Sequence, residues 1–336
     1  MGYSLPTTGA PLNPTPPRPR KAAADAAAIR SVNSERNDTV DALRLVAACA
    51  IIWFHLDDAP YRRVAYAGLA FFLIVSVVFH FRSALREPWP AYWSKRWKRL
   101  LLPWAVWFVI YATANLAFHK PVIPTEAGLL AGVLAGPWIG LWFLPFAFLT
   151  GLLIFPMARC VAGSARPQGS GWWLGATACA AATIPVVSLL RDAVILPAPW
   201  AQWLQASPSL PLGLALGLAQ TAAPEVRQTR IQVVTGAALV ASALVAPFAL
   251  GMALAYSLGV LATSFALLRP RKLPAWVGTA SGLCLGVYLV HGLVISALKR
   301  IPAISSHVLP WFAGTVIVSF ALIWVLRRIP GASKAL

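Results

Sequence analysis

Long apolar runs recur along almost the whole chain, and they restrict its fold more than any other feature. Ten of them approach or reach the length that a bilayer requires of a helix, about 17 to 25 residues. They cover residues 41 to 58, 64 to 82, 100 to 119, 138 to 158, 171 to 190, 199 to 220, 231 to 247, 248 to 268, 274 to 298 and 308 to 326. With 59% hydrophobic and only 11% charged residues, the chain is predicted to be an all-α polytopic membrane protein with about ten transmembrane helices.

The basic residues predict how the helices are oriented. A formal net charge of +18 is compatible with nucleic-acid binding, so the positions of the 28 lysines and arginines must decide. If the N-terminus is cytoplasmic, 21 of them fall on the cytoplasmic side, six fall on the outer side, and Arg44 lies within a run. This asymmetry is what the positive-inside rule describes. Both termini are therefore expected in the cytoplasm, and no nucleic-acid partner is expected.

The chain ends differ from the apolar region between them. Residues 1 to 37 lack a leading apolar core and are rich in Pro, Ala and Thr, which predicts a disordered cytoplasmic tail rather than a signal peptide. Residues 38 to 328 form the expected membrane domain, and residues 329 to 336 a short cytoplasmic tail. The four cysteines have no CxxC spacing and are expected to be small packing residues rather than metal ligands. His80, His119 and His307 lie near the ends of runs and are expected at the membrane interface.

The first run, "DALRLVAACAIIWFHLDD", carries Arg44 and His55. Eleven steps of about 100° return to within roughly 20° of the starting direction, so the two residues share one helix face, about 16 Å apart along the axis. Arginine binds phosphate bidentately, and the pKa of histidine suits a general base near neutrality. An elongated substrate such as acyl-coenzyme A, with phosphates at one end and a thioester at the other, fits a helix face that has an arginine at one end and a histidine at the other. Snorkelling of Arg44 to the headgroups and hydrogen-bonded packing of His55 are the plainer alternatives.

A second basic pair precedes the third run. Arg96 and Arg99 stand three residues apart in "KRWKRLLLP", so a helix would place them at neighbouring positions on one face. Two guanidinium groups at the cytoplasmic boundary can hold the phosphates of a nucleotide carrier. Positive-inside anchoring explains the same residues equally well.

Four further residues are candidates for a supporting or acceptor-binding role. Tyr288 and His291, three apart in the ninth run, would bind the acceptor or orient the site, or else satisfy each other as buried polar groups. Asp58 follows His55 by three residues and would hydrogen-bond its imidazole, or else remain a solvated carboxylate at the helix end. Trp142, in the segment "GPWIGLWFLPF", would contact the acceptor or contribute only to packing at the interface.

The order of these motifs resembles the acyltransferase 3 family of multi-pass membrane acyltransferases. The resemblance rests on R-x10-H at Arg44 and His55, on RxxR at Arg96 and Arg99 running into "LLLP", and on the segments "LWFLPF" and "GVYLVH". The resemblance covers about residues 38 to 328. Within the family, the chain is similar to the stand-alone members, which have no soluble periplasmic domain. The family would make His55 essential to acyl transfer, and Arg44, Arg96 and Arg99 contributors to the donor site.

The resemblance also implies a reaction and a location. It implies transfer of an acyl group, most often acetyl, from cytoplasmic acyl-CoA to a hydroxyl of a cell-envelope or exported polysaccharide or its lipid-linked precursor. Acetyl-CoA is then a substrate, no tightly bound cofactor or metal is expected, and polysaccharide assembly proteins become possible partners in a bacterial inner membrane. Two alternatives remain: a transporter or flippase for a lipid-linked sugar, whose pathway Arg44 and His55 would line, and a non-catalytic subunit of a polysaccharide synthesis complex.

Overall fold

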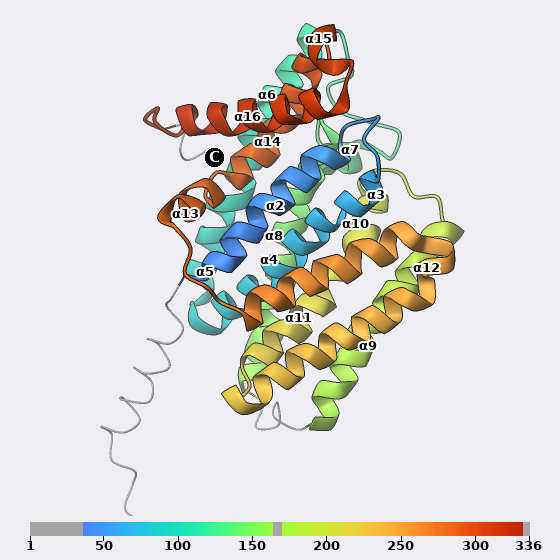
Figure 1. The fold of residues 1–336 in the computed structure, drawn as a ribbon, viewed down its shortest axis with the longest axis vertical. Coiled ribbons are helices and arrows are strands. Elements are labelled where there is room, and N and C mark those ends of the chain that lie inside the picture. Colours follow the sequence, from blue (N-terminus) through green and yellow to red (C-terminus); the bar gives the residue numbers. More distant parts are fainter. Residues whose placement is uncertain (1–35, 164–169, 332–336) are drawn as a thin grey trace, which may run out of the picture. The chain divides into compact units, whose positions relative to one another are not determined.

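The computed structural model describes residues 36–163 and 170–331. All regular secondary structure in these ranges is helical, which confirms the predicted all-α class. The chain divides into two units, Met1–Asn37 and Asp38–Leu336, and every element below belongs to the second (Figure 1). The predicted N-terminal tail lies almost wholly outside the described residues, as does most of the predicted C-terminal tail.

The helices fall on both sides of the gap at residues 164–169. Those before it are α2 (Asp38–Phe54), α3 (Arg62–Ala65), α4 (Ala67–Arg86), α5 (Trp89–Arg96), the π-helical turn η1 (Trp97–Leu101), α6 (Leu102–Ala117), α7 (Leu129–Ala135), the 3₁₀ turn η2 (Ile139–Trp142) and α8 (Phe143–Gly163). Those after it are α9 (Ser170–Ala193), α10 (Trp200–Ala206), α11 (Ser209–Gln220), α12 (Pro224–Leu268), α13 (Ala275–Ser281), α14 (Cys284–Leu298), α15 (Pro302–Ser305) and α16 (Val308–Leu326).

Several of these helices are long and apolar enough to cross a membrane. Within the described ranges there are six, counting adjoining helices together: Arg62–Arg86, Trp89–Ala117, Ile139–Val161, Gly171–Ala193, Pro224–Leu268 and Val308–Leu326. A seventh results if α13 and α14, which are bent by 54°, form one span. At 17 residues α2 is slightly short, and α11 has only 12. The chain is thus a multi-pass membrane protein, while the ten spans and the cytoplasmic termini stay predictions.

Helix α12 folds back on itself, and its two arms correspond to the runs at 231 to 247 and 248 to 268. Ala249 interrupts it with a non-helical backbone (φ −131°, ψ 50°), two residues after Pro247, which has no N–H to donate. The hydroxyls of Thr235 and Ser264 lie 2.7 Å apart, although 29 residues of straight helix would separate them by about 44 Å. The two arms therefore run side by side in opposite directions, as Figure 1 shows.

The core is built around α4, whose neighbours approach it closely through small residues. A Cβ added at Gly213 of α11 would lie only 2.4 Å from Cβ of Val77, and one at Gly259 of α12 would lie 2.9 Å from Cβ of Ala70. Small residues at such crossings let helix backbones approach in a bilayer, where packing rather than water exclusion holds helices together.

Replacing Gly213 with alanine is expected to destabilise the protein by about 1 to 3 kcal/mol, because the new methyl group must displace the Val77 side chain in a packed core. The measurement is the unfolding temperature of the purified protein in detergent. Gly236→Ala is the matched control, since a Cβ there meets no atom within 4 Å and alanine favours the helix. Equal unfolding temperatures for the two variants would contradict the close crossing of α11 and α4.

His80 is buried between helices, while its expected depth near the membrane interface stays a prediction. Its side chain is buried, at 4% exposure, in the centre of the α4 contact with α5 and α8. The Tyr92 hydroxyl donates to the carbonyl of Gly151 at 2.8 Å and lies 3.3 Å from His80 Nδ1. Position near the end of a run did not reveal this burial, because it depends on Tyr92 of α5 and on Gly151 of α8, which accepts the Tyr92 hydrogen bond.

Candidate active site

His55 lies where α2 ends, in a tightened last turn. The helix stops at Phe54 rather than at residue 58, and the N–H of His55 contacts the carbonyls of Ile51 and Ile52 at 3.3 and 3.0 Å. The imidazole Nδ1 is 2.8 Å from the Ile51 carbonyl oxygen. Because a carbonyl only accepts, we assign the proton to Nδ1, which leaves a lone pair on Nε2. The turn thus holds His55 in the tautomer that a base requires.

His291 of α14 pairs with His55 across 236 residues of sequence. Its Nε2 is 3.4 Å from His55 Nδ1, and the two ring centroids are 4.9 Å apart. His291 Nδ1 lies 2.6 Å from the backbone carbonyl of Tyr288, so this nitrogen carries the proton and Nε2 accepts. The imidazoles therefore form one hydrogen-bonded chain, and its free end is Nε2 of His55.

Trp138 forms an aromatic wall beside both histidines. Its ring centroid is 5.9 Å from that of His55 and 5.0 Å from that of His291, and it stacks on Tyr111 at 5.1 Å. Two glycines make room for it: a Cβ on Gly140 would come within 2.2 Å of the indole, and one on Gly292 within 2.6 Å. A side chain at either glycine would displace the indole from the histidine pair.

The sequence indicated Trp142 of this segment, as an acceptor contact or as packing. Trp142 is 5% exposed and packs against Phe143 and Phe146 rather than against the histidines. Trp138, which does contact them, was not singled out. The signal in the sequence is the pair of glycines, because Gly140 follows Trp138 by two residues and Gly292 adjoins His291.

Tyr288 and Asp58 differ in how they relate to the histidine pair. The Tyr288 hydroxyl donates a short hydrogen bond to the carbonyl of Gly140, so it holds η2 against α14. Its backbone carbonyl, not its hydroxyl, orients His291. Asp58 is exposed and forms no hydrogen bond with His55 in the part of the chain that the structure describes.

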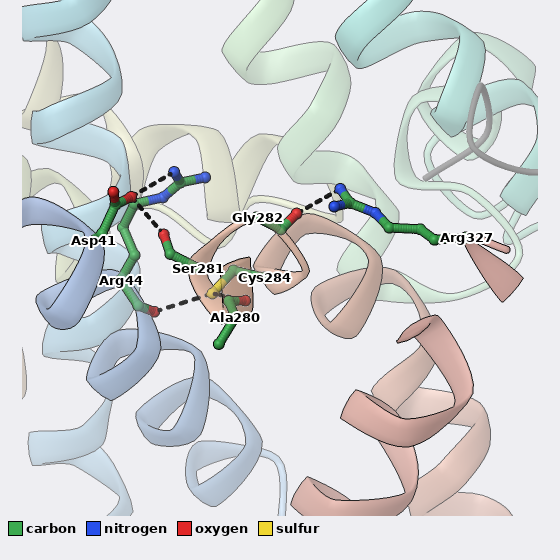
Figure 2. A network of polar contacts seen from close by, with 7 residues as sticks. All are labelled: Asp41, Arg44, Ala280, Ser281, Gly282, Cys284 and Arg327. Atoms are coloured by element: carbon green, nitrogen blue, oxygen red, sulfur yellow. Dashed lines mark hydrogen bonds and ion pairs between the residues drawn. The ribbon is translucent and has the colours of Figure 1, made fainter. Parts of the chain in front are cut away.

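Arg44 lies at the break between α13 and α14 (Figure 2). Its guanidinium is 3.6 Å from Asp41, whose carboxylate accepts a hydrogen bond from the Ser281 hydroxyl at 2.7 Å. The Cys284 thiol donates to the Arg44 carbonyl at 3.6 Å. Cys284 begins the helix that carries His291 two turns later. Arg44 and His55 thus both contact the α13–α14 segment, in keeping with the shared helix face.

Arg96 and Arg99 flank a change in helix geometry. Arg96 ends α5, and Arg99 lies in η1, where the N–H of Leu102 reaches the carbonyl of Trp97, five residues back. This wider turn changes the angle that α-helical spacing gives the two arginines. The Arg96 guanidinium lies over the Tyr92 ring at 4.9 Å, and its Nε is buried without a hydrogen-bond partner. No hydrogen bond joins either arginine to Arg44 or His55 within the described ranges.

Glu87 supplies a carboxylate beside this basic segment. Burial favours its neutral form, but hydrogen bonds from Lys95 (2.6 Å) and Ser83 (2.8 Å), together with the charges of Lys95 and Arg96, outweigh burial and hold the pKa of Glu87 below its usual value. Glu87 therefore stays ionised at neutral pH and anchors Lys95, which leaves Arg96, Lys98 and Arg99 as the cations of this segment without a carboxylate partner in the described chain.

The comparison with protein families agrees with the motifs and the helical membrane architecture. The family model for the acyltransferase domain of this class matches residues 37–328, nearly the whole chain. Neither the curated proteins nor the solved structures yielded a match. The extent of the family match confirms the resemblance carried by the arginine, histidine and aromatic motifs. The chain belongs to the acyltransferase 3 family and is an acyltransferase of the membrane type.

Proposed function

We propose that the protein moves an acyl group, acetyl in the simplest case, from acyl-CoA to a hydroxyl of a cell-envelope or exported polysaccharide or its lipid-linked precursor. The observation that carries this proposal is the hydrogen-bonded pair of His55 and His291, which leaves Nε2 of His55 free to accept a proton. The expected location is the inner membrane of a bacterium, beside the proteins that assemble the polysaccharide.

The proposed reaction uses His55 as general base. Nε2 accepts the proton of the acceptor hydroxyl while the hydroxyl oxygen attacks the thioester carbonyl. The imidazolium that forms is stabilised through its Nδ1–H by the Ile51 carbonyl and by Nε2 of His291. The tetrahedral intermediate then expels the CoA thiolate, which takes the proton back from His55, and the acyl ester remains on the acceptor.

The basic segment around η1 supports a site for the donor's phosphates. The Nε of Arg96 is a buried donor without a partner, and such groups are costly unless a ligand or water satisfies them. Arg99 adds a second guanidinium, and Arg44 is half-buried at the N-terminal end of the helix that leads to His55. A nucleotide phosphate would satisfy Arg96, and the extended arm of CoA would lead toward the histidines.

Replacing Arg96 and Arg99 with glutamine is expected to weaken acetyl-CoA binding by about tenfold for each lost charged hydrogen bond. The measurement is the Kd of acetyl-CoA for the purified full-length protein. Arg271→Gln, a charge change on the same predicted side, is the control and should leave the Kd unchanged. Equal weakening by the control would show that the overall positive charge, and not Arg96 and Arg99 in particular, attracts acetyl-CoA. Absence of saturable acetyl-CoA binding to the unaltered protein would favour a sugar transporter.

The reaction itself is tested in the host. Strains with and without the intact protein are compared for ester-linked acyl groups on their surface polysaccharides, released by mild alkali and quantified by mass spectrometry. Loss of the esters on deletion, and their return with the unaltered gene, is the expected result. Unchanged esters in the deletion strain would contradict the proposed function.

A further inference from the structure

A cavity of about 580 Å³ lies at the end of α2 that carries His55, where Phe54, the residue before His55, lines it. Its walls include Phe54, the two arginines that begin α3, Tyr66, the end of α9 and the bend of α12 around Ala249. Phe54 connects the cavity to the site, because its ring lies 5.2 Å from the His55 imidazole in an edge-on contact. The volume is that of a site for a small ligand or for one part of a larger one.

The cavity walls carry an excess of positive charge. Arg62, Arg63 and Arg191 line it, and Asp192 is the one carboxylate among the lining residues given by the structure. None of these four side chains forms an ion pair with another charged residue of the described chain. Arg62 stacks over the Phe54 ring at 5.4 Å, and the Arg63 side chain lies close to Gly251 at the α12 bend. Three guanidinium groups thus line one space with a single carboxylate, and none of the three is paired with it.

The concentration of these arginines is unusual for their place in the chain. Only six of the 28 lysines and arginines fall on the predicted outer side, and three of those six line this cavity. Topology disfavours basic residues on that side, so it does not account for a cluster there. Guanidinium groups bind carboxylates and phosphates through paired hydrogen bonds, which makes an oxyanion the matching ligand.

We infer that this cavity binds an oxyanion of the acceptor, either the carboxylate of an acidic sugar or a phosphate of the lipid carrier, and so presents the acceptor hydroxyl to His55. That the bound molecule is the acceptor rests on the proposed acyl transfer, whereas the affinity for an oxyanion rests on the cavity alone. The donor's phosphates and the acceptor's anion would then bind at opposite ends of α2, with His55 at the acceptor end.

The test is a binding measurement on the full-length protein in lipid nanodiscs, without acyl-CoA. The probes are a glucuronate-containing trisaccharide and its neutral glucose counterpart, and a short-chain polyprenyl diphosphate and the matching polyprenol. The variant is Arg63→Gln with Arg191→Gln, which leaves Arg62 in its stack on Phe54. The control is Arg300→Gln, on the same predicted outer side but over the Phe118 ring (4.3 Å) rather than in the cavity. Unfolding temperatures establish that each variant is folded.

At least one acidic probe is expected to bind more tightly than its neutral counterpart, and the double variant should weaken that binding about 100-fold, or about tenfold for each guanidinium. Arg300→Gln should leave it unchanged. Whichever acidic probe shows this pattern identifies the source of the oxyanion. Equal binding of acidic and neutral probes, or equal weakening by the control, would overturn the inference.

The results distinguish a failure of the inference about the cavity from a failure of the proposed function. If acyl transfer persists with an unaltered KM for the acceptor in the double variant, the cavity does not serve the acceptor while the acyltransferase assignment stands. If the acidic probe binds through Arg63 and Arg191 but acetyl-CoA does not bind the protein, the cavity stands and the proposed reaction fails.

Discussion

Replacing His55 with alanine is expected to lower acyl transfer by about 10² to 10⁴ fold, which is what a positioned general base typically contributes. The reason is that Nε2 of His55 is the free end of the histidine chain, so no other nitrogen of the pair can take the proton. The measurement is the rate of acetyl transfer from acetyl-CoA to the polysaccharide acceptor in membranes that contain equal amounts of each protein.

His307→Ala is the matched control for this change. His307 is an exposed histidine that precedes α16, and its loss should leave the rate unaltered. The His55 variant should keep its affinity for acetyl-CoA, because the main proposed phosphate ligands, Arg96 and Arg99, belong to α5 and η1. Full acylation of the acceptor by the His55 variant would remove the general base from the mechanism.

A second experiment, on the unaltered protein, distinguishes two ways in which His55 can work. A general base never bonds to the acyl group, whereas a nucleophilic imidazole carries it transiently on Nε2. Rapid-quench mass spectrometry of the peptide that contains His55, after mixing the protein with acetyl-CoA alone, decides between them. The base mechanism predicts no acetylated peptide before the acceptor is added.

Local patterns predicted the all-α class and the shared orientation of Arg44 and His55. Apolar runs of spanning length correspond to helices in the structure, including both arms of α12, and the spacing of Arg44 and His55 placed them toward one neighbouring segment. These predictions succeed because period and length are properties of a single helix. The end of α2 at Phe54 was not predicted from the run at 41 to 58, because it depends on the tightened turn at His55.

The pairing of His55 with His291 could not be read from spacing. The two residues come from helices 236 residues apart, and their contact depends on how closely α14 and η2 approach α2. That approach is set by Gly140 and Gly292, which accommodate the Trp138 ring between them. Similarly, η1 is π-helical. The expectation that Arg96 and Arg99 share one face assumed the rotation per residue of an α-helix, which does not apply in η1. Interhelical packing, rather than local propensity, decides both features.

The His55–His291 contact leads to the second large effect, that of His291→Ala. Without Nε2 of His291, the imidazolium of His55 loses one of the two acceptors of its Nδ1–H, and a hydrogen bond to a charged group contributes about 1.5 to 3 kcal/mol. The rate constant kcat should therefore fall by about 10 to 150 fold. The KM for acetyl-CoA should change little, because His291 is a positioning residue and lies apart from the arginines.

A conservative variant separates this positioning role from simple loss of packing. Glutamine at position 291 keeps an oxygen acceptor near the place of Nε2 and fills most of the volume, so His291→Gln should recover part of the lost kcat. Gly213→Ala provides a destabilised protein whose altered residue lies between α11 and α4, away from the histidines, and its kcat should remain close to that of the unaltered protein once the folded fraction is measured. If His291→Ala and His291→Gln lose activity equally and only in proportion to their folded fraction, His291 acts through packing alone, and the hydrogen-bonded pair does not drive the reaction.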